Sequence, residues 1–357
     1  MPDWSTMDAE RRPASDPVKS MLDRMKENNE RIARRLGQAA QLQADPQTDS
    51  DRAEYERLLR GLKDGEDPLE NGRIRGIIVK DLQRVGLGES AHSVLGKIRG
   101  IPRESRDYKD IYVYLFFAYR RATGAHDGYN GVFVSNENKM YVNRTAQITE
   151  QGFLLTFFHE TGHAVDHNSG RISQTAALFQ ALQEDTRDFI RVPLAYYGSA
   201  LTEPQKQRVL DAFLSGKCAE ATVESGGPVG HPPAWLDAEE KEVYNKVVQA
   251  CYYMLMRAPH QSDTIAWDVM TGITNNAITS GGGHLKAYTK TNYYWYGPNG
   301  RPTGNAESEA WAEHYSAIAN SDAEAIDVNR QQMPHATVVL GQLADTAAQR
   351  CRRKYHG

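Results

Sequence analysis

Cysteine is scarce in this chain, and the three that occur, Cys218, Cys251 and Cys351, are widely spaced. Cysteines so far apart form neither a disulfide framework nor a cysteine-type zinc site, so we expect plain thiols in a reducing compartment. The sequence also lacks any apolar run near the roughly 20 residues that a membrane-spanning helix needs. Its N-terminus has no basic segment followed by an apolar one, which predicts no secretory signal peptide and synthesis in the cytoplasm.

An excess of charge of one sign is missing as well. The formal net charge is −4, so the composition does not indicate a nucleic-acid partner. Hydrophobic residues make up 40% and charged residues 25% of the chain, as in a soluble globular protein. A length of 357 residues is enough for one large domain or two ordinary ones.

The most informative stretch is His159-Glu160-Thr161-Gly162-His163, which has the form His-Glu-x-x-His. On a helix, residues i and i+4 lie on one face, so the two imidazoles can share a metal ion, and Glu160 points toward its bound water. Apolar residues at 153, 154, 157 and 158 precede the motif at helical spacing. Thr149 can cap the start of this helix, and residues 168–170 offer a stop. The stretch predicts a buried helix with two zinc ligands and a general base.

The segments before this helix are less uniform. Residues 1–66 are polar and charge-rich, with one amphipathic helix expected over 18–36 and a linker over 41–52. We interpret 1–66 as a mobile arm with a docked helix, or alternatively as a delivery or partner-binding segment. Short helices, or a strand with a helix, are expected over 74–85 and 91–101, and a buried aromatic helix over 108–121. Residues 131–135 and 139–143 flank a turn and predict a β-hairpin.

The segments after it have mostly helical periodicity, interrupted by Gly- and Pro-rich loops such as 225–233. We expect a helical insertion at about 170–265 within a catalytic domain that spans 67–357. The helices predicted here cover 175–190, 203–215, 237–256 and 265–278, with a final helix near the C-terminus.

A second informative stretch predicts a helix from Asn305 to about Asn320. Glu309 and Glu313 are four residues apart and therefore share a face of this helix. Their neighbours, among them Ala310, Trp311 and Ala312, favour a buried helix. Buried carboxylates need partners, and a metal site would supply them.

Together, the two stretches resemble the gluzincin metalloproteases, in particular the catalytic domain of anthrax lethal factor and related bacterial toxins. The resemblance implies Glu309 as the third zinc ligand and a tyrosine hydroxyl at the site. Tyr296, which precedes Gly297, is the closest match for that tyrosine, and His284 is the alternative for steadying the oxyanion. An edge strand ahead of the metal helix holds substrate in such enzymes.

Geometry favours a ligand from a second segment. Asp166 and His167 share the first helix, but His167 lies about 6 Å of helix rise beyond His163 and cannot reach the same ion. Glu307 has no carboxylate four residues later, whereas Glu309 has Glu313. We expect Glu313 to accept a hydrogen bond from a ligating histidine. Asp166 either supports the ligands in the same way or is a surface carboxylate near the helix end.

The sequence thus predicts a helix-rich α+β fold, a zincin-like metalloprotease domain with a small β-sheet over the active-site helix. The expected activity is zinc-dependent hydrolysis of a protein or peptide substrate. By resemblance, the setting is a bacterial effector or toxin delivered into the cytosol of another cell. The alternative is a zincin-like structural or binding module of a phage or toxin system that cleaves nothing; the presence of Glu160 favours the enzyme.

Overall fold

The computed structural model describes residues 46–100, 119–122, 131–136, 138–143, 150–215, 219–224, 227–257, 264–279 and 294–356. It is 72% helical with few strands, which confirms the helix-rich α+β part of the prediction. Within the described residues, no helix is both long and apolar enough to cross a membrane. His284, Thr149 and the helix expected over 18–36 lie outside the described residues.

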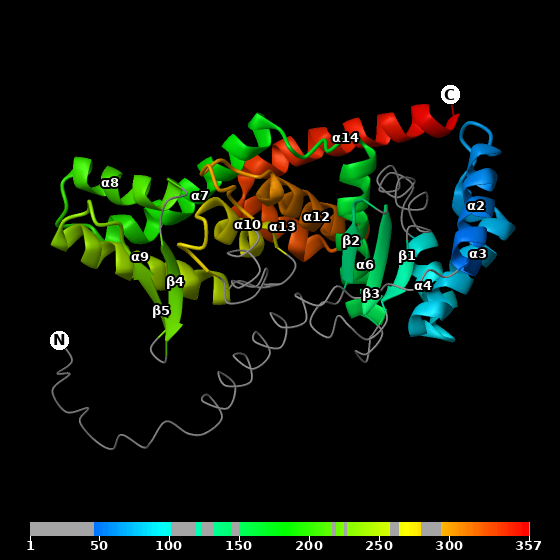
Figure 1. Ribbon diagram of the computed structural model, residues 1–357, viewed down its shortest axis with the longest axis horizontal. Helices are drawn as coiled ribbons and strands as arrows, with labels where there is room; N and C mark the ends of the chain where they lie inside the picture. Colours follow the sequence, from blue (N-terminus) through cyan, green and yellow to red (C-terminus); the bar gives the residue numbers. More distant parts are fainter. Residues whose placement is uncertain are drawn as a thin grey trace, which may run out of the picture.

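Two long helices form the centre of the molecule (Figure 1). Helix α6 spans Glu150–Asn168 and packs against α12, which spans Asn305–Ala319. The phenylalanines of the predicted apolar face, Phe153, Phe157 and Phe158, are all buried. Helix α6 ends just before Gly170, whose φ of 85° is a left-handed conformation that glycine adopts at low cost. Both central helices therefore have nearly the predicted limits.

A three-stranded sheet covers one side of α6 (Figure 1). Strands β2 (Gly131–Val134) and β3 (Lys139–Asn143) form the predicted antiparallel hairpin, and β1 (Tyr119–Ala122) pairs in parallel with β3. The strand order is β1–β3–β2, so β2 lies at an edge of the described sheet. Asn138 and Asn168 exchange side-chain hydrogen bonds of 3.2 and 2.8 Å, which fastens the hairpin turn to the end of α6.

The strand β1 corrects one sequence prediction. Residues 119–121 were expected at the end of a buried helix that began at 108, and the remainder of that helix lies outside the described residues. In the structure, Tyr119 pairs with Met140 and Ala122 with Asn143. Pairing with a strand distant in sequence overrides the local helical pattern, because strand preference depends strongly on tertiary context.

The N-terminal part of the described chain is not a linker. Helix α2 (Pro46–Arg60) begins inside the predicted linker over 41–52 and buries Tyr55 and Leu59 against α3 (Gly72–Leu82). An ion pair of 2.6 Å joins Glu54 to Arg73. The part of the predicted arm from residue 46 onward is therefore packed. A short 3-10 helix (Pro68–Glu70), a π-helical turn (Gln83–Leu87) and α4 (Ser90–Arg99) complete this end.

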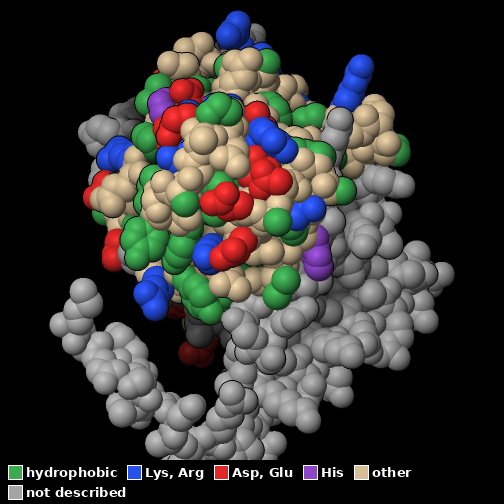
Figure 2. All heavy atoms as spheres, turned by 90° about the vertical axis from the view of Figure 1, so that its left-hand side faces the viewer, with side chains coloured by type: hydrophobic (Ala, Val, Ile, Leu, Met, Phe, Trp, Pro, Cys, Tyr) green, Lys and Arg blue, Asp and Glu red, His purple; other side chains and the backbone are tan. Residues whose placement is uncertain are grey.

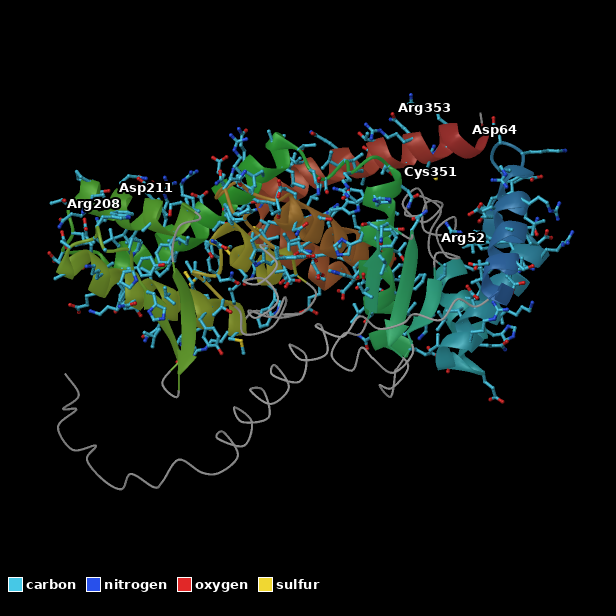
Figure 3. All side chains as sticks on the ribbon, in the orientation of Figure 1. Arg52, Asp64, Arg208, Asp211, Cys351 and Arg353 are labelled. Atoms are coloured by element: carbon cyan, nitrogen blue, oxygen red, sulfur yellow. The ribbon has the colours of Figure 1, made fainter. Side chains whose placement is uncertain are left out.

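The opposite end is formed by the predicted insertion, with α7 (Ala176–Tyr197), α8 (Glu203–Leu214) and α9 (Ala238–Arg257). The loop expected over 225–233 is partly a strand: β4 (Ala219–Glu224) and β5 (Gly227–His231) form an antiparallel hairpin. Arg208, labelled in Figure 3, joins α8 to α9 through the carbonyl of Trp235 at 2.7 Å and the buried Glu240 at 3.2 Å.

Seen from this end, the surface has acidic and basic side chains intermixed (Figure 2). Exposed ion pairs such as Lys206–Glu203 and Lys246–Glu242 belong to α8 and α9. Pairs of this kind contribute little to stability.

Three further helices follow the insertion in sequence. They are α10 (Ile265–Ile273), α13 (Ala323–Gln332) and α14 (Pro334–His356).

Candidate metal centre

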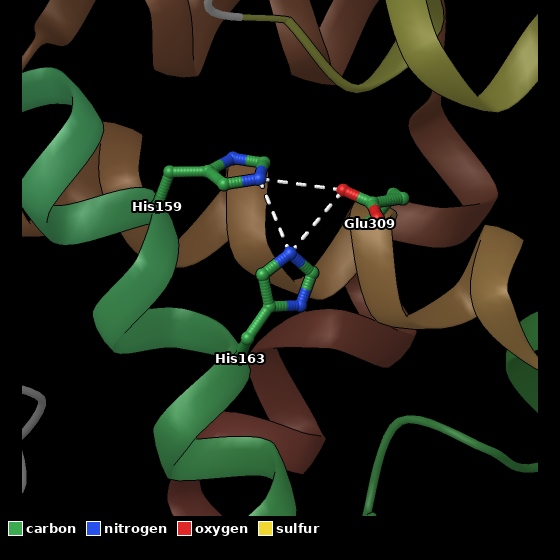
Figure 4. Close-up of side chains that lie close together, drawn as sticks. All are labelled: His159, His163 and Glu309. Atoms are coloured by element: carbon green, nitrogen blue, oxygen red, sulfur yellow. Dashed lines mark hydrogen bonds and ion pairs between the residues drawn. The ribbon is translucent and has the colours of Figure 1, made fainter. Parts of the chain in front are cut away.

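Three side chains from the two central helices converge on one point (Figure 4). The Nε2 atoms of His159 and His163, both on α6, are 3.2 Å apart. Oε2 of Glu309, on α12, lies 3.3 Å from each of them. These residues form the one group in the described chain that places three potential metal ligands together. They are the three that the sequence selected.

The spacing of these atoms fits a small tetrahedral ion. Zinc bonds to nitrogen and carboxylate oxygen are about 2.0–2.2 Å long, so neighbouring ligand atoms of a tetrahedral site are about 3.3–3.5 Å apart. The observed separations of 3.2, 3.3 and 3.3 Å match those edges closely. Two imidazoles and one carboxylate, with a fourth position open, form the donor set of catalytic zinc sites.

His159 is oriented by a second carboxylate of α12. Its Nδ1 lies 2.9 Å from Oε1 of Glu313, so Nδ1–H donates to the carboxylate and the Nε2 lone pair points at the shared centre. Burial alone lowers the pKa of His159, but Glu313 and Glu309 outweigh it and raise this pKa well above its usual value. In the metal-free protein a proton on His159 therefore offsets part of the negative charge of these buried carboxylates.

His163 is supported by a longer chain of contacts. Its Nδ1 is 3.3 Å from the hydroxyl of Ser308, which is 3.5 Å from Oδ2 of Asp166. Asp166 is buried and also accepts bonds of 2.8 and 2.7 Å from the backbone and hydroxyl of Ser173. Asp166 is therefore not a surface carboxylate. It supports a ligand, which was the other of the two sequence interpretations, but it contacts His163 through Ser308 and not directly.

The tyrosine beside the ligands is Tyr294 rather than Tyr296. The hydroxyl of Tyr294 donates to Oε1 of Glu309, whereas the hydroxyl of Tyr296 donates to the carbonyl of Ile273 at 2.9 Å. Burial raises the pKa of Tyr296 to about 12. This corrects the sequence prediction, which selected Tyr296 because a glycine, Gly297, follows it. Tyr296 is buried, and its backbone forms a short bridge with Pro302.

Glu160 follows the first histidine on α6 and contacts the sheet. Its side chain is 8% exposed, and a Cβ placed on Gly131 would lie 2.9 Å from its Cγ and 2.7 Å from Thr156. A glycine in a strand often marks such a close approach of another group. The candidate general base is therefore held against β2, an edge strand of the described sheet.

Three residues at this centre were not selected from the sequence. Gly131 begins the predicted hairpin strand, where a glycine is a weak sign of close contact. Ser308 directly precedes Glu309 and carries no distinctive signal. Tyr294 is one of several aromatic residues in a row, and its position is set by the loop. Glu307, an alternative ligand in the sequence, is buried but is not part of the converging group, and burial raises its pKa.

Comparison with known proteins adds no family to these observations. No protein-family model matches the chain, and neither a curated protein nor a solved structure shows significant similarity to it.

Proposed function

We propose that this chain is a zinc-dependent endopeptidase of the gluzincin type, with zinc held by His159, His163 and Glu309. The observation that carries the proposal is the convergence of the three ligand atoms, two of which come from α6, the helix that also bears Glu160. Buried charges in proteins are paired or bind a metal ion, and a donor set of two imidazoles and one carboxylate favours zinc over magnesium or calcium, which prefer oxygen ligands.

The residues around the centre suit peptide hydrolysis. Zinc at this position supplies polarisation of the scissile carbonyl and a lowered pKa for the attacking water. Glu160 accepts the proton of that water and passes it to the leaving nitrogen. Tyr294, placed beside Glu309, takes the role of oxyanion donor that the sequence assigned to Tyr296 or His284.

The substrate would be an extended peptide segment. Strand β2 pairs with β3 on one side, and in the described sheet its other edge is available for an added strand. An extended peptide paired there would pass close to Glu160, because Gly131 of β2 contacts that side chain. By resemblance to bacterial toxin metalloproteases, we expect the substrate to be a protein of another cell.

The test compares the wild-type protein with Glu160→Gln on a broad peptide library. The variant should keep zinc, because the ligands are unchanged, and lose cleavage by about 10²-fold or more, as expected when a general base is removed. A matched control is Glu242→Gln, which changes an exposed glutamate on α9 and should cleave normally. Equal cleavage by wild type and Glu160→Gln would refute this mechanism. Zinc-loaded wild type that cleaves nothing would favour the non-catalytic binding module.

A further inference from the structure

The two helices that supply the ligands are in close contact beside the metal centre. His159 and His163 belong to α6, and Glu309 belongs to α12. The distance between the helix axes therefore determines whether the carboxylate reaches the imidazoles. Any residue that sets this distance acts on the site without contacting an ion.

Gly162 lies at a point of close contact between α6 and α12. A Cβ at this position would lie 2.8 Å from Cα of Ala312, 3.3 Å from its carbonyl oxygen and 3.2 Å from Cβ of Tyr315. Carbon atoms in contact are normally about 3.5–4.0 Å apart. Two of these neighbours are backbone atoms of α12, which cannot rotate away. Glycine inside a helix is otherwise unfavourable, so its presence here has a packing reason.

Trp311 of α12 contacts the same point of α6 through a hydrogen bond. Its indole Nε1–H donates to the carbonyl oxygen of Gly162 at 2.8 Å, and the residue is 1% exposed. A carbonyl has two lone pairs, so it can accept this bond in addition to its helical one. Trp311 lies between Glu309 and Glu313 in α12, and Gly162 directly precedes His163 in α6. The bond therefore joins the middle residue of the segment from Glu309 to Glu313 to the residue that directly precedes His163.

We propose that Gly162 and Trp311 are positioning residues that set the spacing and register of α6 and α12, and through them the zinc affinity of the site. This inference rests on the proposed zinc site. Adding one methyl group at 162 would require about 0.7 Å of separation to restore a normal contact. Metal and catalytic sites tolerate displacements of about 0.5 Å, so Glu309 would leave the geometry that the histidines need.

The experiment measures zinc dissociation constants by competition with a chelator for the full chain and three variants. Gly162→Ala should weaken zinc binding about 10–100-fold, as loss of other supporting groups does. Gly341→Ala is the matched control: it also adds a methyl group to a helical glycine, in α14, but with nothing within 4 Å of the new Cβ. It should bind zinc like the wild type. Trp311→Phe keeps an aromatic ring but removes the N–H, and should weaken binding about 10-fold.

Two further readouts separate positioning from folding. The electronic absorption spectrum of the Co²⁺-substituted protein reports ligand geometry, and it should change in Gly162→Ala and Trp311→Phe but not in Gly341→Ala. Thermal unfolding of the metal-free proteins shows whether a variant folds. If Gly162→Ala does not fold, Trp311→Phe decides the question by the same criteria.

Wild-type affinity and spectrum in both folded variants would overturn the inference while leaving the zinc site intact. Absence of zinc from the wild-type protein would instead overturn the proposed function, and the inference with it.

Discussion

The charge of Glu313 offers the most informative perturbation of the centre. Glu313→Gln keeps an oxygen that can accept the Nδ1–H of His159, but it removes the negative charge 2.9 Å from the ring. The Glu313 side chain is 7% exposed, so solvent screens this interaction only weakly. Loss of a carboxylate behind a ligating histidine typically costs about 10–100-fold in metal affinity, or about 1.4–2.8 kcal/mol.

The same change should alter the pH dependence of zinc binding. Glu313 and Glu309 raise the pKa of His159 above its usual value against the effect of burial. Below that raised pKa, zinc must displace a proton, so affinity in the wild type should fall as the pH is lowered. In Glu313→Gln, His159 holds this proton less tightly, so the zinc affinity of the variant should fall less steeply as the pH is lowered. The advantage of the wild type should therefore be largest at high pH and shrink at low pH.

The assay is chelator competition at a series of pH values between about pH 5 and about pH 8, where histidine charge changes. Glu242→Gln, which removes an exposed carboxylate on α9, is the control and should follow the wild type throughout. A ratio of the two affinities that stays constant with pH would refute the role of Glu313 in holding the proton. Equal affinities at every pH would refute its support of His159 altogether.

Other residues give distinct signatures. Tyr294→Phe should lower kcat by about 10²-fold with zinc retained, whereas Tyr296→Phe should lower stability by about 0.5–1.5 kcal/mol in chemical denaturation and leave kcat unchanged. The reverse pattern would restore the assignment made from the sequence. Gly131→Val should impair cleavage with zinc content unchanged, because the new side chain would meet Glu160; normal cleavage would place the substrate elsewhere. Asp185→Asn should lower the free energy of unfolding by about 1–2 kcal/mol, because the Asp185 carboxylate accepts backbone bonds of 3.1 and 2.8 Å at the start of α14. An unchanged thermal midpoint would contradict this capping role.

The parts of the fold set by local pattern could be predicted from the sequence. Helix α6 has apolar residues at helical spacing and a glycine stop, and α12 has a continuous small and aromatic face. The hairpin of β2 and β3 has its turn between two short apolar runs. In each case neighbouring residues provide both the periodicity and the end signals, so one segment contains the information.

Features that depend on distant partners could not be predicted in this way. The strand β1 forms because Tyr119 pairs with Met140, and α2 is ordered by burying Tyr55. At the centre, helix geometry identified the two histidines and required a third ligand from another segment, and the resemblance to gluzincins indicated Glu309. Tyr294 was not predicted to lie beside the ligands. Which of the two tyrosines reaches the centre depends on where the hydroxyl of Tyr296 finds an acceptor. That acceptor is the carbonyl of Ile273, 23 residues away in the sequence.

The location of zinc tests the central claim most directly. Crystals of the zinc-loaded protein, measured at the zinc absorption edge, should show one anomalous peak per chain. We predict that this peak lies about 2.0–2.2 Å from Nε2 of His159, Nε2 of His163 and a carboxylate oxygen of Glu309. A peak coordinated by Asp166 or Glu307 in place of Glu309, or no peak between the two histidines, would contradict the account.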